Sequence, residues 1–464
     1  MRLRHRLGYA AAGLLALLIL LAPPAYRTLF PPTRVYASDR EHFLYGSVGV
    51  EPVQGLPLRI WETMPGICMP TDQQAAGYRR FGFLWEPGHA TPVGMPVERV
   101  GVDRIGINCA LCHAGEVRGP DGQARLIAGA PNTRLNLQAY LRFLQRCAAS
   151  PAFTPEAVFT EAERLGHPLS AMERLFYRRI VLPQVKQQLA KQAWQLQFMD
   201  DQTDWGPGRS PGFQPAKIQI LGLPFDGTLD ITDFPALWNM RGRRNGLLHW
   251  DGVNSDLHEV VLNSGIGNGA SARSIDRASL DRIERWLIDL RSPRFPWPVN
   301  AALAAQGKSL FAQECADCHA PGGAKTGQAI PIAWTGTDRN RLDAMTQETV
   351  DGFSRLDIYP WRYRHFAKTD GYVAAPLDGI WARAPYLHNG SVPTLDALLL
   401  PPNRRPVRFG RGSTSYDPVA GGFRSDRGTL FDTQLPGNGN GGHLWGTERS
   451  DAERHALVEY LKTL

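Results

Sequence analysis

The sequence contains little cysteine and no concentration of basic residues. Only six of its 464 residues are cysteine. Four of the six form two C-x-x-C pairs far apart in the chain. Neither pair has a second one nearby, which argues against a four-thiolate zinc site. The net charge is +7, but lysine and arginine are dispersed and no recognition motif is present. We therefore expect no binding to nucleic acid.

Histidine directly follows each C-x-x-C pair. The two motifs are Cys109, Cys112 and His113, and Cys315, Cys318 and His319. C-x-x-C-H is the attachment signature of c-type haem. Two thiols three residues apart can each form a thioether to one edge of the porphyrin, and the next imidazole then lies beneath the ring, directed at the iron. The sequence predicts two covalently bound haems, with His113 and His319 as proximal iron ligands.

The other two cysteines are Cys68 and Cys147. They could form a disulfide if the protein resides in an oxidising compartment. Cys147 lies on the apolar side of an expected helix, so a buried free thiol is an equal alternative. Both possibilities are open at this point.

Residues 1–30 have the form of an export signal. Three arginines precede an apolar run at 7–22. The run is short for a full membrane span, and no clean A-x-A cleavage site follows it. A cleaved signal and a retained membrane anchor are both open. The basic flank is cytoplasmic in either case. We expect the rest of the chain to be periplasmic, either soluble or anchored to the inner membrane.

The fold class expected is mainly α with long loops, because 47 glycines and 36 prolines are above average usage. Apolar spacing and capping residues predict five helical regions. The first begins after Asn132 or Thr133. The second spans 170–198, with a break near Pro183, and the third spans 274–290. The fourth begins at Ala301 and the fifth at Ser450. Capping boxes are expected at Ser170 with Glu173 and at Ser450 with Glu453.

A helix leading into C-x-x-C-H and a closing helix after long loops are typical of a cytochrome c domain. We therefore expect two cytochrome c-like domains, each around one covalent haem. The first spans 40–291 and contains a helical insertion at about 134–198. The second spans 301–464, and the stiff segment 292–300 separates the two.

Five segments together resemble one family. They are INCALCH at 107–113, HWDG at 249–252, ECADCH at 314–319, RAPYLHNGSVPTL at 383–395 and GNGGHLWGTERSDAERHALVEYLKTL at 439–464. The chain resembles the bacterial di-haem cytochrome c peroxidase superfamily, in the branch that contains rubber oxygenase. The resemblance begins near residue 50 and reaches the C-terminus. It implies two cytochrome c-like domains with one haem in each and a tryptophan between them.

The resemblance implies a sixth iron ligand for the second haem. Where peroxidases of this family carry methionine, this chain has His443, which we expect to be the distal ligand, as in the rubber-oxygenase branch. A bis-imidazole iron is low spin and closed to substrates. Two alternatives are open. His443 could be a loop imidazole bonded to backbone, or His388, which the family places beside the haem edge, could be the ligand instead.

The first haem lacks an obvious sixth ligand. No histidine or methionine lies between His113 and His167. His167, Met172 and His258 are conceivable ligands, but lone residues of these types are more often structural. We expect an open iron that can bind dioxygen or peroxide. The resemblance places residues 259–269 on the distal wall. That stretch has no aromatic residue, whereas rubber oxygenase has a phenylalanine there.

Trp250 corresponds to the tryptophan between the haems and would relay electrons between them. A core aromatic that only fills space is the plainer interpretation. Neither neighbour in HWDG, His249 or Asp251, is given a chemical role. No carboxylate cluster has recognisable calcium-loop spacing.

Two functions of different classes follow. One is a periplasmic di-haem oxidoreductase that activates dioxygen or peroxide at the first haem, with the second haem as electron-transfer centre and a periplasmic electron donor. Its organic substrate is unknown and could be hydrophobic; a cytochrome c peroxidase is the nearer alternative. The other is a di-haem electron-transfer cytochrome without substrate chemistry.

Overall fold

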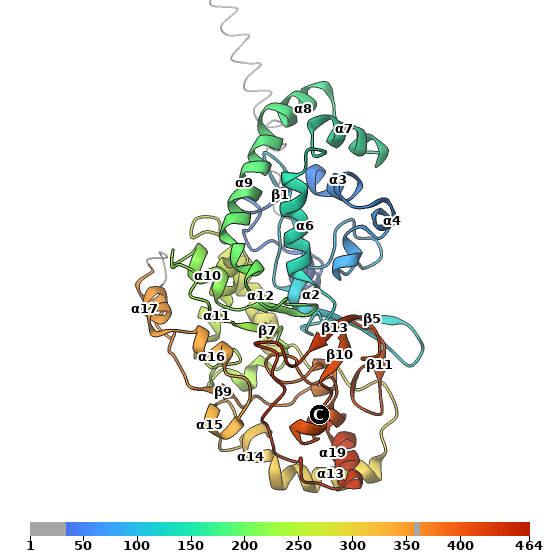
Figure 1. Cartoon of the computed structure of the whole chain (residues 1–464), viewed down its shortest axis with the longest axis vertical. Helices are drawn as coiled ribbons and strands as arrows, with labels where there is room; N and C mark the ends of the chain where they lie inside the picture. Colours follow the sequence, from blue (N-terminus) through green and yellow to red (C-terminus); the bar gives the residue numbers. More distant parts are fainter. Residues whose placement is uncertain (1–33, 357–361) are drawn as a thin grey trace, which may run out of the picture.

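A computed structural model describes residues 34–356 and 362–464 (Figure 1). The expected signal or anchor at residues 1–30 lies outside the described residues. Within them, no helix combines the length and the apolarity that a membrane crossing requires.

The expectation of a mainly α fold needs correction, because the described structure is mixed. Helices predominate, but one three-stranded sheet and five two-stranded sheets, all antiparallel, lie between them. Their strands are two to five residues long, too short for an alternating pattern to be recognised in the sequence. The strands are β1 Leu56–Pro57, β2 Val97–Val100, β3 Val102–Ile105, β4 Ala114–Arg118, β5 Ala124–Ala128, β6 Arg209–Pro211, β7 Ile231–Asp233, β8 Ala329–Pro331, β9 Gly371–Val373, β10 Arg408–Arg411, β11 Tyr416–Asp417, β12 Gly422–Phe423 and β13 Thr429–Asp432.

The helices form two groups, one before and one after residue 300. Those before it are α2 Asp39–Tyr45, α3 Leu58–Cys68, α4 Thr71–Gln74, η1 Gly77–Phe81, α5 Ala110–His113, α6 Leu137–Ala149, α7 Pro155–Arg164, α8 Ala171–Phe176, η2 Tyr177–Val181, α9 Leu182–Gln195, η3 Gln197–Asp200, α10 Gln214–Gln219, η4 Met240–Arg243, α11 Leu257–Gly267 and α12 Arg277–Asp289. Those after it are α13 Ala301–Glu314, α14 Ala316–His319, α15 Ile332–Thr335, α16 Asn340–Ala344, α17 Gln347–Arg355, η5 Ile380–Arg383, α18 Leu395–Leu398, η6 Pro402–Arg404 and α19 Asp451–Leu461.

The region of the expected helical insertion forms helices α6 to α9, which lie in the upper part of Figure 1 together with α3 and α4. Asn136, and neither Asn132 nor Thr133, caps its first helix. No break occurs near Pro183. The chain instead makes a π-helical turn at Tyr177–Val181 between α8 and α9. That turn lies directly before the proline, whose missing N–H weakens the regular helical bonding.

A disulfide joins the insertion to the N-terminal helices. Cys68 at the end of α3 is bonded to Cys147 in α6, with a Cα–Cα distance of 5.4 Å. The bond packs within an apolar core shared by α3, α6 and α9. Of the two alternatives for these cysteines, the structure has the disulfide.

The C-terminal part is built on α13 and α19, which pack against each other at the bottom of Figure 1. Both begin where the sequence predicts. Asn300 caps α13, and Ser450 forms a capping box with Glu453 at the start of α19. The short α14, which carries the second C-x-x-C-H motif, follows α13 directly.

Buried ion pairs connect the two predicted halves of the chain. Arg411 donates to Asp233 at 2.6 Å, and Arg341 donates to Asp251 at 3.0 Å. All four side chains are at most 6% exposed. Arg411 also donates to the carbonyls of Pro207 and Gly390, and such fully bonded pairs can fix relative orientation. The two halves of the chain, each with one C-x-x-C-H motif, are thus joined through buried side chains.

Candidate haem sites

The first C-x-x-C-H motif is held by its preceding residue, Asn108. The buried amide nitrogen of Asn108 donates to the carbonyls of Phe43 and Gly46, at 3.1 and 2.8 Å, and its oxygen accepts from the Ala110 N–H. Cys109 therefore starts α5 in a fixed position. Neither Cys109 nor Cys112 is in a disulfide, so both thiols are available for thioether formation.

His113 has the tautomer that an iron ligand requires. Its Nδ1 donates to the carbonyl oxygen of Pro235 at 2.8 Å, which leaves the lone pair of Nε2 free. Burial lowers the pKa of His113 to about 4, so the ring is neutral. Pro235 comes two residues after β7, so a segment distant in sequence orients the ring.

His319 is oriented in the same way. Its Nδ1 donates to the carbonyl oxygen of Ala375 at 2.8 Å, two residues after β9. Burial lowers its pKa. Both predicted proximal ligands therefore have the same interaction, a hydrogen bond to a backbone carbonyl that fixes the tautomer. A proximal haem ligand needs this arrangement.

The ring of His443 lies near that of His319. Their ring centroids are 6.3 Å apart and their planes differ by 38°. A bond of about 2.0–2.1 Å from a metal to each imidazole nitrogen, plus about 1.15 Å from nitrogen to ring centre, gives about 6.3–6.5 Å for two imidazoles on one iron. The observed separation fits. Nδ1 of His443 is buried without a protein partner among the described residues. Burial, His319 and Arg405 together lower the His443 pKa to about 4.

Arg405 holds the loop that carries His443. Its guanidinium is buried and donates five hydrogen bonds, each to a backbone carbonyl. The acceptors are the carbonyls of Leu398, Leu400, Asn440, Gly442 and His443. His443 itself has a positive φ of 50°, which is unfavourable for a residue other than glycine. The position of the ring is therefore imposed by its surroundings.

His388, the rival ligand, is engaged elsewhere. The Tyr372 hydroxyl donates to the carbonyl oxygen of Asp338 at 2.7 Å. Nε2 of His388 lies 3.0 Å from the same hydroxyl oxygen and must therefore donate to it. The rings of Tyr372 and His388 are stacked at 4.0 Å. Because its Nε2 carries a proton, His388 offers no lone pair from that atom to an iron.

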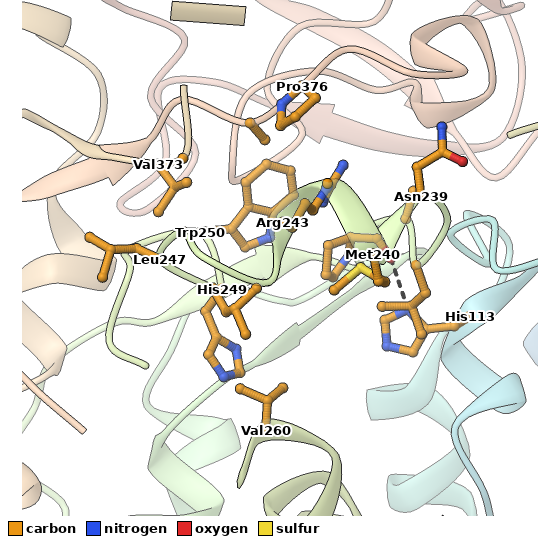
Figure 2. Close-up of a pocket in the computed structure, with 18 of the residues that line it drawn as sticks. His113, Asn239, Met240, Arg243, Leu247, His249, Trp250, Val260, Val373 and Pro376 are labelled. Atoms are coloured by element: carbon orange, nitrogen blue, oxygen red, sulfur yellow. Dashed lines mark hydrogen bonds between the residues drawn. The ribbon is translucent and has the colours of Figure 1, made fainter. Parts of the chain in front are cut away.

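A cavity of about 990 Å³ opens beside His113 (Figure 2). Its volume lies at the upper end for cofactor and ligand sites. Val260, Asn263 and Ser264 line it from one face of α11. They belong to the 259–269 stretch expected on the distal wall. That wall contains no aromatic residue, as the sequence indicates.

None of the three conceivable distal ligands lines this cavity. Met172 is 75% exposed, and His167 is also exposed. The His258 ring is on the surface and bonds to Glu284 at 2.7 Å. With Asp281 these two form a surface group of possible metal ligands, the one such group among the described residues. All three therefore lie on the surface and away from this cavity.

His249 is the cavity residue that sequence reasoning missed. It borders the cavity directly before Trp250, and its Nε2 is buried without a partner among the described residues. Burial and nearby Arg341 lower its pKa to about 4, against the opposing effect of Asp251. Its position in the HWDG motif, next to Trp250, is the sequence feature that could have identified it.

Two half-buried arginines of the cavity are suited to carboxylates. Nε and Nη2 of Arg243 and Nε of Arg383 have no partner among the described residues, and both side chains line the cavity. The Nη atoms of Arg383 donate to the carbonyls of Pro376 and Asp378, but guanidinium N–H groups that are buried without an acceptor are costly unless an anion binds them. Haem propionates are such anions. The imidazoles, thiols, cavity and arginines together fit a c-type haem.

Trp250 connects the supports of the two proximal histidines. Its indole N–H donates to the carbonyl oxygen of Asp233 at 2.9 Å, two residues before Pro235. Its own carbonyl accepts from the N–H of Val373 at 2.8 Å, two residues before Ala375. Trp250 is therefore hydrogen-bonded to both segments that orient the predicted proximal histidines.

Comparison with known proteins bears on the second site. A family model described as RoxA-like, cytochrome c-like, matches residues 371–410, which include β9, Ala375 and His388. The match supports a RoxA-like cytochrome. It also supports haem c and a haem-based oxidoreductase family. The wider di-haem peroxidase placement and the number of haems stay predictions.

Two similar proteins come from Sinorhizobium fredii (strain NBRC 101917 / NGR234). Uncharacterized protein y4iM is 32% identical over 285 residues, which cover 50% of this chain and 64% of that protein. Uncharacterized protein y4iJ is 25% identical over 495 residues, covering 84% of this chain and 81% of that protein. The chain thus spans less than two thirds of y4iM. Neither name states a reaction.

Proposed function

We propose that this chain is an exported, periplasmic di-haem oxidoreductase that activates dioxygen or peroxide at the His113 site. The His319 site holds an electron for that reaction, and Trp250 connects the two. A haem with an open sixth position supplies the binding and reduction of dioxygen or peroxide. The residues of this chain orient that group, close one site and leave the other accessible.

The observation that carries the proposal is the difference between the two sites. The His319 ring has a second imidazole, His443, at the separation that one iron requires. Among the described residues, the ring contact of His113 is instead with Phe234, and a large cavity opens beside it. A closed site suits electron storage, and an accessible one suits substrate chemistry.

The cavity also favours an organic substrate. Phe213, Phe353 and Phe366 are among the residues that line it, and apolar walls favour apolar ligands. Oxidation of a hydrophobic substrate, as in rubber oxygenase, is one form of the proposal. Reduction of peroxide, as in cytochrome c peroxidase, is the other. In both, a periplasmic donor supplies electrons. The Cys68–Cys147 disulfide suits an oxidising compartment.

His249 favours a second candidate function. If its unpartnered Nε2 ligated the first iron, both irons would be closed. The chain would then be a di-haem electron-transfer cytochrome without substrate chemistry.

A carbon monoxide difference spectrum of the fully reduced, haem-loaded protein tests the proposal, with the haem content quantified as pyridine haemochrome. We expect carbon monoxide to bind one of two haems. The His113→Ala variant should lose this signal. The His443→Gly variant should gain a second binding haem, and added imidazole should suppress it. Absence of carbon monoxide binding by the unaltered protein would refute the open first site and favour the carrier.

A further inference from the structure

We propose that His249 acts on the distal side of the first site, where its Nε2 hydrogen-bonds to dioxygen or peroxide without ligating the iron. This inference rests on the proposed function and deepens it. It gives His249 a role in substrate binding, which the HWDG motif by itself does not indicate.

The geometry places His249 and His113 on one cavity. Both residues line it, although they come from segments more than a hundred positions apart. Figure 2 shows their two rings bordering the same space, with Met240 above it and Val260 below it. His113 occupies one side of that space by virtue of its bond to Pro235. His249 is the imidazole available on the other side.

The Nε2 atom of His249 requires a partner. It is buried, and no described residue bonds to it. A buried polar atom without a hydrogen bond carries an uncompensated desolvation cost. Folded proteins usually avoid this cost, and exceptions are associated with bound groups or catalytic roles. A small oxygen species in the cavity would satisfy the atom.

The backbone at His249 is held in an unfavourable conformation. Its φ is 65°, in the left-handed region, which histidine adopts more often than bulky apolar residues do. The neighbouring residues fix it. The Leu248 N–H donates to the Asn254 carbonyl at 2.7 Å, and Arg341 holds the Asp251 carboxylate. An unfavourable conformation that is imposed from both sides is typical of functional sites.

The charges around His249 suit a hydrogen-bonding role. Burial and the Arg341 cation keep its imidazole neutral at physiological pH. A neutral ring has one N–H donor and one acceptor nitrogen. Asn263 and Ser264 add polar groups to the same wall. These polar groups lie on the same cavity as His249 and suit a small oxygen species such as dioxygen or peroxide.

The test uses two substitutions at position 249 and one control. His249→Asn tolerates the left-handed backbone but is too short to reach a ligand. His249→Gln keeps an amide donor at nearly the original reach. His258→Asn is the matched control, because that imidazole is on the surface of α11. Infrared spectra of the carbon monoxide adduct report on hydrogen bonding, and stopped-flow measurements with hydrogen peroxide report on rate.

We expect His249→Asn to shift the C–O stretching band and to slow the reaction with hydrogen peroxide by about 10²-fold, as for loss of a positioned acid–base group. His249→Gln should restore both in part, and His258→Asn should match the unaltered protein. An unshifted band in His249→Asn would overturn the inference while leaving the open first site intact. If the unaltered protein bound no carbon monoxide and His249→Asn did, His249 would be an iron ligand, and both proposals would fail.

Discussion

At the scale of single residues, Arg405 is the side chain on which the second site depends most. Its five hydrogen bonds join η6 and α18 to the loop of His443. We expect Arg405→Ala to lower the free energy of unfolding by about 2–4 kcal/mol, because buried carbonyls lose their donor. The low-spin spectrum of the second haem should also be lost in part. Denaturation curves and electron paramagnetic resonance measure the two effects.

Adjacent Arg404 provides the control for this variant. Its side chain is exposed in η6, so Arg404→Ala should change neither stability nor spectrum. Arg405→Lys keeps the charge but cannot reach five acceptors at once. Its loss of stability and of low-spin signal should therefore be intermediate between those of Arg404→Ala and Arg405→Ala. An Arg405→Ala protein with unchanged stability and an intact low-spin signal would show that the loop holds His443 without the guanidinium.

Glu51 makes stability depend on pH. It is fully buried, and burial raises its pKa to about 7 despite the hydrogen bond from Ser47. An unfolded glutamate titrates near about 4.3. The folded protein therefore holds a proton that the unfolded chain has released between these values. Stability from this group is fully present below about pH 4 and is lost as the pH rises through 7.

Substitution of Glu51 by glutamine should remove this dependence. We expect Glu51→Gln to raise the free energy of unfolding at pH 8 by up to about 3 kcal/mol and to have little effect near pH 4. Urea denaturation at a series of pH values measures the difference. Exposed Glu448 is the control, since Glu448→Gln should be neutral throughout. A pH-independent effect of Glu51→Gln would contradict the assignment.

At the scale of elements, the packing of α13 on α19 fixes the C-terminal part. Gly307 lies at their closest approach, where a Cβ atom would collide with the carbonyl oxygen of Ala456. We expect Gly307→Val to destabilise the protein by about 1–3 kcal/mol or more, the usual cost of overpacking. Thermal denaturation measures this. Ala305→Val on the exposed face of α13 should be close to neutral. Helix propensity alone would favour Gly307→Val and disfavour Ala305→Val, so a Gly307→Val protein no less stable than the unaltered one would contradict the predicted collision.

The same scale shows how far the sequence predicts the fold. The helices with strong amphipathic spacing or a capping box, such as α12 and α19, begin within three residues of the prediction, because their signals are local. The small sheets were not predicted, because their pairing depends on distant segments. At the sites, the cysteines and proximal histidines could be predicted from spacing. The carbonyls of Pro235 and Ala375, 122 and 56 residues from their histidines, could not.

At the scale of the whole molecule, the two sites share one hydrogen-bonded connection. Asp233 accepts from the Trp250 indole through its carbonyl and from Arg411 of the C-terminal half through its carboxylate. Val373 donates to the Trp250 carbonyl. The positions of the two proximal histidines are therefore coupled through one residue. A substitution at 250 can affect electron transfer without altering either iron ligand.

We expect Trp250→Phe to slow electron transfer between the haems by an order of magnitude or more, which needs a barrier increase of only about 1.4 kcal/mol. The phenyl ring loses the N–H bond to Asp233 and is harder to oxidise than indole. Rapid reduction of one haem, followed by the spectrum of the other, measures the rate. Trp445→Phe is the control. The ring centroids of Trp445 and His443 are 5.5 Å apart, but Trp445 is not part of the hydrogen-bonded connection between the two proximal histidines. An unchanged rate in Trp250→Phe, with both spectra intact, would leave Trp250 a structural link only, because the two supports would still be joined through its backbone carbonyl.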